Sequence, residues 1–273
     1  MFIIKFVLFC LLSFILISCE EVIDVELNNS IPNIVIEAQI TDQPGPYFVK
    51  ISKTGNFYDQ SIFPAVSGAK VIISDMEANH DTLTEINPGI YQTNSTIGKI
   101  DNFYYLNVMV NDNKYYAETR MLKQTKIDSI TYKFNSSTGP GQGKNGGYEL
   151  HCYFVDEPDQ RDYCMIKLYL NGKQDDTYFL YNGKFNVSGV IDYNRFRQKF
   201  KLNDTIKLEL INLEPSVFDY FNTLNNILAG EGMRGIISTG TPANPNTNLS
   251  NGALGYFGAF TIDSKTIIIN NNY

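Results

Sequence analysis

The sequence has no tryptophan, two histidines and four cysteines among its 273 residues, and these scarcities restrict its chemistry. His80 and His151 are too few for a multi-histidine metal centre, and neither lies in a pattern that predicts a Ser-His-Asp triad. Basic residues are also scarce, with 22 Lys and Arg against 29 Asp and Glu and a formal net charge of −7. Nucleic-acid binding needs a surplus of basic side chains, so we expect no nucleic-acid partner.

The residues that are abundant favour a folded β protein. Hydrophobic residues make up 43% of the chain and charged residues 19%, which excludes a disordered polypeptide. The 18 Tyr and 18 Phe residues, like Val, Ile and Thr, favour strands. The length allows one large or two ordinary domains, and we expect an all-β fold.

The first nineteen residues resemble the leader of a bacterial lipoprotein. Lys5 is their only charge, and the apolar run at 6–17 is shorter than the ~20 residues of a membrane span. Residues 16–19, Leu-Ile-Ser-Cys, resemble a lipobox, whose cysteine is acylated and becomes the new N-terminus. We predict that residues 1–18 are a signal peptide and that Cys19 is the lipidation site, carrying acyl chains such as palmitate. The alternative is an ordinary secretory signal with a chance cysteine.

Residues 19–33 are predicted to be a tether, which reaches at most roughly 45 Å from the membrane. Glu20 and Glu21 resemble the acidic signal of Bacteroidetes lipoproteins that are moved to the cell surface. Removal of residues 1–18 takes away one Lys, so the mature charge is 21 − 29 = −8. Because an anionic body is repelled by anionic lipid, attachment must come from the acyl chains. We expect an outer-membrane, lipid-anchored protein at the cell surface.

Residues 34–122 are predicted to form an N-terminal β-sandwich. Short runs of strand-forming residues follow one another without helical periodicity, and residues 111–113, Asn-Asp-Asn, predict a hairpin turn. The predicted strands are 34–40, 47–53, 69–74, 89–93, 104–110 and 114–118. Residues 66–73, 89–91 and 105–108 resemble the immunoglobulin-like and transthyretin-like modules of bacterial surface proteins.

Residues 123–273 are predicted to form a second β-rich domain, with a new set of strands opening at 127–130. Its other predicted strands are 148–155, 163–170, 177–181, 199–202 and 205–213. We expect a tight turn at Asn171 and Gly172, and a hairpin that joins the last two strands through Asn203 and Asp204. Residues 138–147 contain five glycines and a proline, which indicates a flexible loop.

One helix is predicted near 216–229. Ser216 is suited to the N-cap and Asp219 lies three residues later, close to a capping box, while Gly230 or Gly232 can end the helix. Four apolar side chains lie on one stripe: Val217, Phe221, Leu224 and Leu228. We expect this stripe to pack on the second sheet; the alternative is a surface for a partner.

Cys152 and Cys164 flank a turn that contains Pro158. A symmetric hairpin about this proline would place the two cysteines opposite each other, at a separation that a disulfide can bridge. The alternative is two separate thiols on neighbouring strands. Two cysteines without further Cys or His partners do not predict a metal site, and the acidic residues of the loops lack EF-hand spacing. We therefore expect no metal and no cofactor.

Three Asp-Ser/Thr-aliphatic triplets resemble the O-glycosylation acceptors of Bacteroidetes. Their acceptor residues are Thr82, Ser129 and Thr205. Because the motif is short, chance matches are common, and Thr205 can equally be a turn residue.

The most specific stretch of the chain is 244–259, in which Gly252, Gly255 and Gly258 recur every third residue. Glycine at these positions permits a positive φ or close backbone approach, and Tyr256 and Phe257 would fill the space; a ligand could use the same closeness. Together with residues 154–158 and 67–69, this stretch resembles a Bacteroidetes lipoprotein family known as domain of unknown function 4249. Cys164 departs from the large residue expected there.

The resemblance covers essentially the whole mature chain. It implies an outer-membrane lipoprotein found beside TonB-dependent transporters, without catalytic residues. We therefore expect a non-enzymatic accessory or binding component of such an uptake system. Its partners would be the membrane, a transporter, and a peptide, glycan or other nutrient.

Two other functions stay open. The first is a fimbrial or adhesive cell-surface subunit, which needs a basic cleavage site before its first strand. The first basic residue after Cys19 is Lys50, inside a predicted strand. The second is a hydrolase with two carboxylates brought together in space, although the absence of Trp weakens a sugar-stacking platform.

Overall fold

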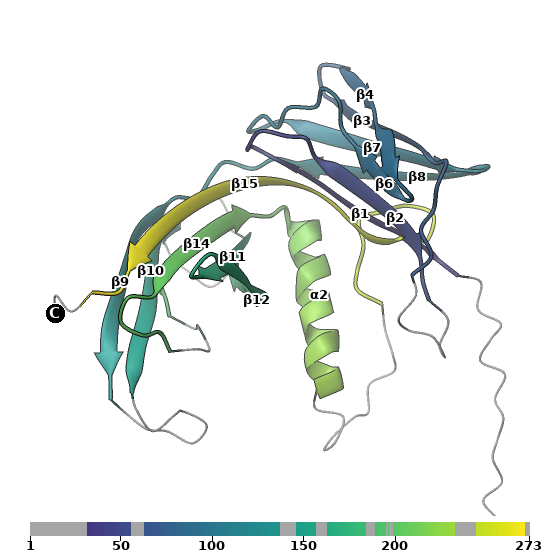
Figure 1. The fold of residues 1–273 in the computed structure, drawn as a ribbon. Helices are drawn as coiled ribbons and strands as arrows, with labels where there is room; N and C mark the ends of the chain where they lie inside the picture. The colour runs from purple at the N-terminus through teal and green to yellow at the C-terminus, as the bar shows by residue number, and fades with distance from the viewer. Residues whose placement is uncertain are drawn as a thin grey trace, which may run out of the picture.

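The computed structural model describes residues 32–55, 63–136, 146–156, 163–183, 189–194, 196, 199–232 and 244–270. These residues form strands β1 to β15 and helix α2, so the prediction of an all-β, sandwich-like fold with a helix in its second part is confirmed (Figure 1). The signal peptide, Cys19, nearly all of the predicted tether and most of the glycine-rich loop lie outside the described residues.

The first half of the chain contains β1 (Ile34–Thr41), β2 (Phe48–Lys53), β3 (Lys70–Asp75), β4 (His80–Thr82), β5 (Thr84–Asn87), β6 (Ile90–Gln92), β7 (Phe103–Val110) and β8 (Asn113–Arg120). The second half contains β9 (Ile127–Asn135), β10 (Gly147–Asp156), β11 (Tyr163–Leu170), β12 (Lys173–Asn182), β13 (Gly189–Tyr193), β14 (Thr205–Asn212), α2 (Pro215–Gly232) and β15 (Leu254–Ile268). All six strands predicted for the first half are present, and the short strands β4 and β5 were not predicted.

Three sheets are built from these strands. One sheet has eight strands in the order β12-β11-β14-β15-β1-β2-β6-β5, and the others have the orders β4-β3-β7-β8 and β13-β10-β9. Both smaller sheets pack on the same face of the large sheet, and α2 lies on the opposite face, inside the curve of β15 (Figure 1). We call this second face the concave face.

Strand β15 belongs to both halves of the protein. Its first part pairs in parallel with β1, from Leu254 to Phe260, and its last part pairs antiparallel with β14, from Thr261 to Ile268. The domain boundary between residues 122 and 123 stays a prediction. Because β15 pairs with β1 of the first half and with β14 of the second half, the two sandwiches share one sheet.

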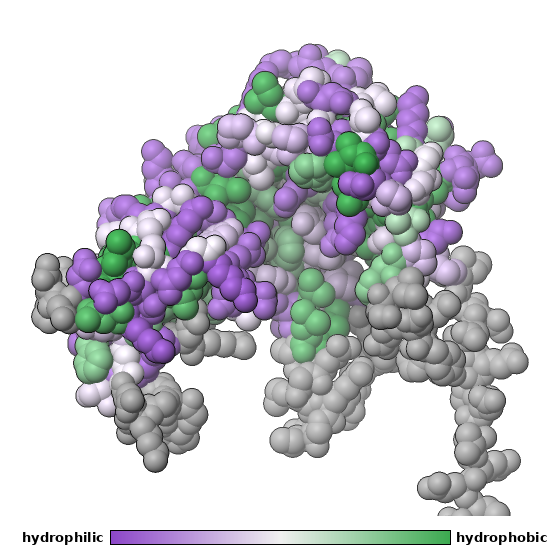
Figure 2. All heavy atoms as spheres, viewed as in Figure 1, coloured by the Kyte–Doolittle hydropathy of each residue, from purple (hydrophilic) through white to green (hydrophobic). Residues whose placement is uncertain are grey.

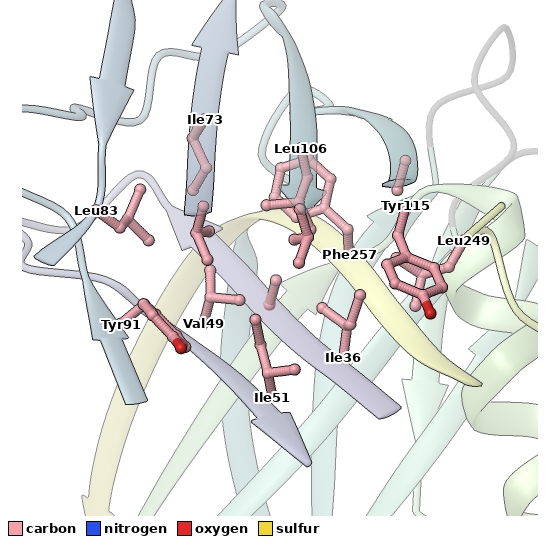
Figure 3. Close-up of a cluster of buried hydrophobic side chains, with 14 of the residues drawn as sticks. Ile36, Val49, Ile51, Ile73, Leu83, Tyr91, Leu106, Tyr115, Leu249 and Phe257 are labelled. Carbon is pink, nitrogen blue, oxygen red and sulfur yellow. The ribbon is translucent and has the colours of Figure 1, made fainter. Parts of the chain in front are cut away.

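The core of the first sandwich lies between β1, β2, β6 and β15 on one side and β3, β7 and β8 on the other. Alternation on the strands places Ile36 and Val49 opposite Ile73 and Leu106, and Phe257 of β15 fills the space between the layers (Figure 3). Residues from the far end of the chain therefore complete the first core.

The second core contains Cys152 of β10 and Cys164 of β11, and the predicted hairpin between these strands is wrong. Strand β10 has β9 and β13 as neighbours, whereas β11 has β12 and β14, so the chain passes from one sheet to the facing sheet. The tight turn at Asn171 and Gly172 is confirmed, with φ of 51° and 83°.

A second correction concerns residues 199–202, which do not pair with β14. Phe200 instead forms an isolated bridge with Tyr148 of β10 and is buried in the second core. Asn203 has φ 68°, and the backbone N–H of Asp204 donates to the carbonyl of Lys201, so residues 201–204 form a turn. The burial of Phe200 favours this turn over a regular hairpin.

Helix α2 begins at Pro215, just before the predicted Ser216. The backbone N–H groups of Val217 and Phe218 donate to the carbonyl of Glu214, which makes Glu214 the N-cap and puts proline at its preferred first position. The predicted apolar stripe is only partly buried, because Val217 is inaccessible whereas Leu228 is 55% exposed. The first half of the helix packs on the sheet, and the second half extends beyond it.

Candidate functional site: the concave face around helix α2

Four aromatic side chains meet where α2 crosses the concave face, and we call them the aromatic cluster. They are Tyr178 of β12, Tyr220 and Phe221 of α2, and Tyr256 of β15. The ring of Tyr256 lies 5.0 Å from that of Tyr220 and 4.9 Å from that of Phe221, and Phe221 lies 5.5 Å from Tyr178. Rings at these separations hold the helix firmly against the sheet.

The hydroxyl groups of this cluster stay protonated at ordinary pH. Burial raises the pKa of Tyr178 to about 12. Burial also raises the pKa values of Tyr220 and Tyr256, and the negative charge of Glu37 raises these two further by a smaller amount. Tyr178 donates a 3.3 Å hydrogen bond to the carbonyl of Phe221. The cluster can therefore donate hydrogen bonds and make apolar contacts, but it does not supply a base.

Charged side chains lie on both sides of the aromatic cluster. Glu37 of β1 is the register partner of Tyr256 and forms a 3.5 Å ion pair with Lys50. Towards the other end of the face, Tyr169 and Lys207 both bind Glu209, at 2.9 and 2.8 Å. The concave face thus combines aromatic rings with fixed polar groups, a composition typical of binding surfaces.

Residues 246–251 connect α2, β15 and the edge of β8, and we call them the bridging segment. The backbone N–H of Asn246 donates to Thr223 of the helix, and the Asn248 side chain bonds both the N–H and the carbonyl of Phe257. Ser250 exchanges two 2.8 Å hydrogen bonds with the backbone of Tyr116. These bonds cover the open edge of β8, which protects it from pairing with other chains.

The recurring glycines have three different roles beside the bridging segment. Gly252 has φ 71° in an open turn, and Gly255 has φ 99° and lies against the carbonyl of Ile36. Gly258 is covered by the ring of Phe260. Tyr256 packs against the helix, whereas Phe257 points to the first core on the opposite face.

Among the described residues, neither Cys152 nor Cys164 forms a disulfide, and both side chains are buried. Burial raises the pKa of Cys152 to about 12, so its thiol is not a nucleophile at neutral pH. The Sγ of Cys164 accepts a 3.6 Å hydrogen bond from Asn212. At position 164, where a large residue was expected, the cysteine therefore accepts a hydrogen bond from a buried amide.

The three predicted glycosylation acceptors lie far apart on the fold. Thr82 is exposed, and Ser129 and Thr205 are half-buried. The acid that precedes Thr82 has a structural role: buried Asp81 accepts hydrogen bonds from the backbone N–H groups of residues 94, 95 and 96. Burial raises the pKa of this carboxyl, but the hydrogen bonds outweigh it and hold the pKa below its usual value.

His80 is exposed, and His151 lies beside Asp192 of β13, with 2.8 Å between Nδ1 and Oδ1. No local sequence pattern predicts this pair, because it depends on the pairing of β10 with β13. In the described part of the chain, no group of three or more His, Cys, Asp or Glu side chains could hold a metal ion. None of the described helices is long and apolar enough to cross a membrane.

One protein-family model matches most of the chain. A family model described as Domain of unknown function (DUF4249) matches residues 20–266. The chain belongs to this family. The match confirms the DUF4249 resemblance and covers both sandwiches and helix α2. No curated protein sequence matches this DUF4249 chain.

Proposed function

We propose that this DUF4249 protein is a lipid-anchored, non-enzymatic binding component of a TonB-dependent uptake system in the outer membrane of a Bacteroidetes bacterium. The observation that carries the proposal is the position of α2. The aromatic cluster fixes the first half of this helix on the concave face, and its second half extends beyond the sheet with Leu228 exposed. A rigidly mounted helix end of this kind is suited to contact with another protein.

The surface around the helix end supports a protein contact. Hydrophobic side chains gather at the lower end of α2 (Figure 2). Leu224 and Ile227 are half-buried and Leu228 is exposed, so the helix presents apolar side chains where the sheet no longer covers it.

The N-terminal sequence supports a membrane location for this surface. The lipobox-like residues end at Cys19, and β1 begins at Ile34, so the folded body starts within roughly 45 Å of the acyl chains. A transporter in the same membrane is within reach of a body held at this distance.

The position of β1 makes the adhesive alternative less favourable. Subunits that assemble by strand donation lose their first strand to open a groove. Here β1 is hydrogen-bonded on one side to β2 and on the other to β15, and Ile36, Ala38 and Ile40 are buried in the first core. Release of β1 would break the sheet that joins both sandwiches.

The test is affinity purification of the tagged, lipidated protein from solubilised outer membranes. We expect a TonB-dependent transporter to co-purify, and Leu228→Glu to reduce its recovery at least fivefold, because a charge would be placed at the contact. Val190→Glu is the matched control, since Val190 is also exposed but lies on β13, away from α2. Failure to recover a transporter would contradict the proposal, and equal loss in both variants would exclude the helix end as the contact.

A further inference from the structure

The outer face of the sheet β4-β3-β7-β8 carries two lysines on either side of an exposed methionine. Lys70 of β3 and Lys114 of β8 are both register partners of Met109 of β7, so the three side chains form one row on the same face. Met109 is 38% exposed. The opposite face of this sheet is the first core, so the row is a surface feature.

A second row of side chains lies beside the first. Ile72, Asn107 and Tyr116 are register partners across the same three strands, and Tyr116 is 41% exposed. The ring of Tyr116 stacks with that of Tyr105, with centroids 6.4 Å apart. The two rows border a shallow hollow of about 280 Å³, lined by Lys70, Ile72, Asn107, Val108, Met109, Lys114 and Tyr115.

The two lysines of this hollow have no ion-pair partner among the described residues. Glu118, on the same face of β8 as Lys114, accepts a hydrogen bond from Tyr116. The lysine Cα atoms are two strand spacings apart, roughly 10 Å, so both ammonium groups can reach one anion held above Met109.

We propose that this hollow binds a small amphipathic carboxylate. The carboxylate would lie between the two lysines, and its apolar chain would cover Ile72 and Met109. Both parts are needed. The chain has a net charge of −7, which repels a bare anion, and an uncharged apolar molecule would leave the lysines without a partner.

The test uses octanoate and the full mature chain with ¹³C-methyl methionine, reconstituted in nanodiscs. Met109 reports the hollow. Met76 is 61% exposed elsewhere and reports non-specific contact, while Met121 and Met165 are buried and report the fold. We expect octanoate to shift the Met109 methyl signal with saturation and to leave the other three unchanged. Octanol, which lacks the charge, and acetate, which lacks the chain, should each require at least tenfold higher concentration.

Substitution of the lysines completes the test. The double variant Lys70→Gln, Lys114→Gln should weaken octanoate binding about tenfold, because it loses two partly exposed ion pairs with the carboxylate. Lys53→Gln with Lys173→Gln removes the same charge from other surfaces and should have no effect. The proposal is overturned if the Met109 signal does not move or moves without saturation. It is also overturned if the first double variant binds octanoate as well as the second.

Discussion

Gly255 of β15 lies so close to Ile36 of β1 that a Cβ atom at position 255 would overlap the carbonyl oxygen of Ile36. Gly255 also has φ 99°, in the left-handed region that other residues avoid. This contact is within the parallel pairing that joins the first sandwich to the strand shared with the second. The absence of a side chain at Gly255 therefore allows β15 to pair closely with β1.

Gly255→Ala is expected to lower the free energy of unfolding by at least about 4 kcal/mol, or to prevent folding. The added methyl group has to push β15 away from β1, and the backbone conformation is itself costly for alanine. Chemical denaturation followed by circular dichroism measures the change.

The control is Gly252→Ala. Gly252 also has a positive φ, 71°, but no atom lies within 4 Å of a Cβ added there. We expect a loss of only about 1 kcal/mol from backbone strain. Equal losses in the two variants would show that φ alone, and not the contact with Ile36, explains the requirement for glycine at position 255.

Asn212→Leu is expected to destabilise the protein by about 3 kcal/mol. Buried Asn212 accepts a 2.8 Å hydrogen bond from the backbone N–H of Thr125 and donates one of 2.6 Å to its hydroxyl. Thr261 and Cys164 complete the network. Leucine would leave these buried groups without partners. Thermal and urea unfolding measure the loss. The control is Asn107→Leu, because Asn107 is exposed, and it should change the free energy of unfolding by less than about 0.5 kcal/mol.

Asp81→Asn is expected to change the response of stability to acid. Hydrogen bonds hold the pKa of Asp81 in the folded protein below its unfolded value, so the carboxylate contributes stability above the unfolded pKa of about 4. This contribution is lost as the pH falls through the folded pKa. Wild type should exceed the variant by about 1–2 kcal/mol at pH 7, and the gap should shrink below about pH 4. A gap that is constant from pH 7 to pH 3 would contradict the role of the charge.

Cys152 and Cys164 are expected to resist thiol reagents in the folded protein. At pH 8, a thiol of pKa about 12 such as Cys152 is ionised in roughly one molecule in 10⁴, and both side chains are inaccessible. Ellman's reagent should label them only after denaturation, when two thiols become reactive. A protein that gains no reactive thiol on unfolding without reductant would reveal the disulfide instead.

Local pattern was sufficient to predict most strands of the first sandwich. Ile36, Ala38 and Ile40 alternate with polar residues and are buried on one face of β1, as the pattern predicts. Asn171 and Gly172 predicted their turn because their φ preferences are intrinsic.

Features that depend on distant partners could not be predicted in the same way. The parallel pairing of β1 with β15 joins Val35 to Leu254, and no local signal specifies such a partner. The assumption of a symmetric hairpin failed for Cys152 and Cys164, because the chain between their strands crosses from one sheet to the facing sheet. The aromatic cluster likewise needs Tyr178 and Tyr256 from strands that the sequence does not show to be close.

The central claim, that the protein acts as a binding component fixed to the membrane through Cys19, is tested most directly by metabolic labelling with an alkynyl palmitate analogue. Wild type should incorporate the label and sediment with the outer membrane, whereas Cys19→Ser should lose both properties and still fold. An unlabelled wild-type protein that is released in soluble form, or equal labelling of the Cys19→Ser variant, would contradict the account.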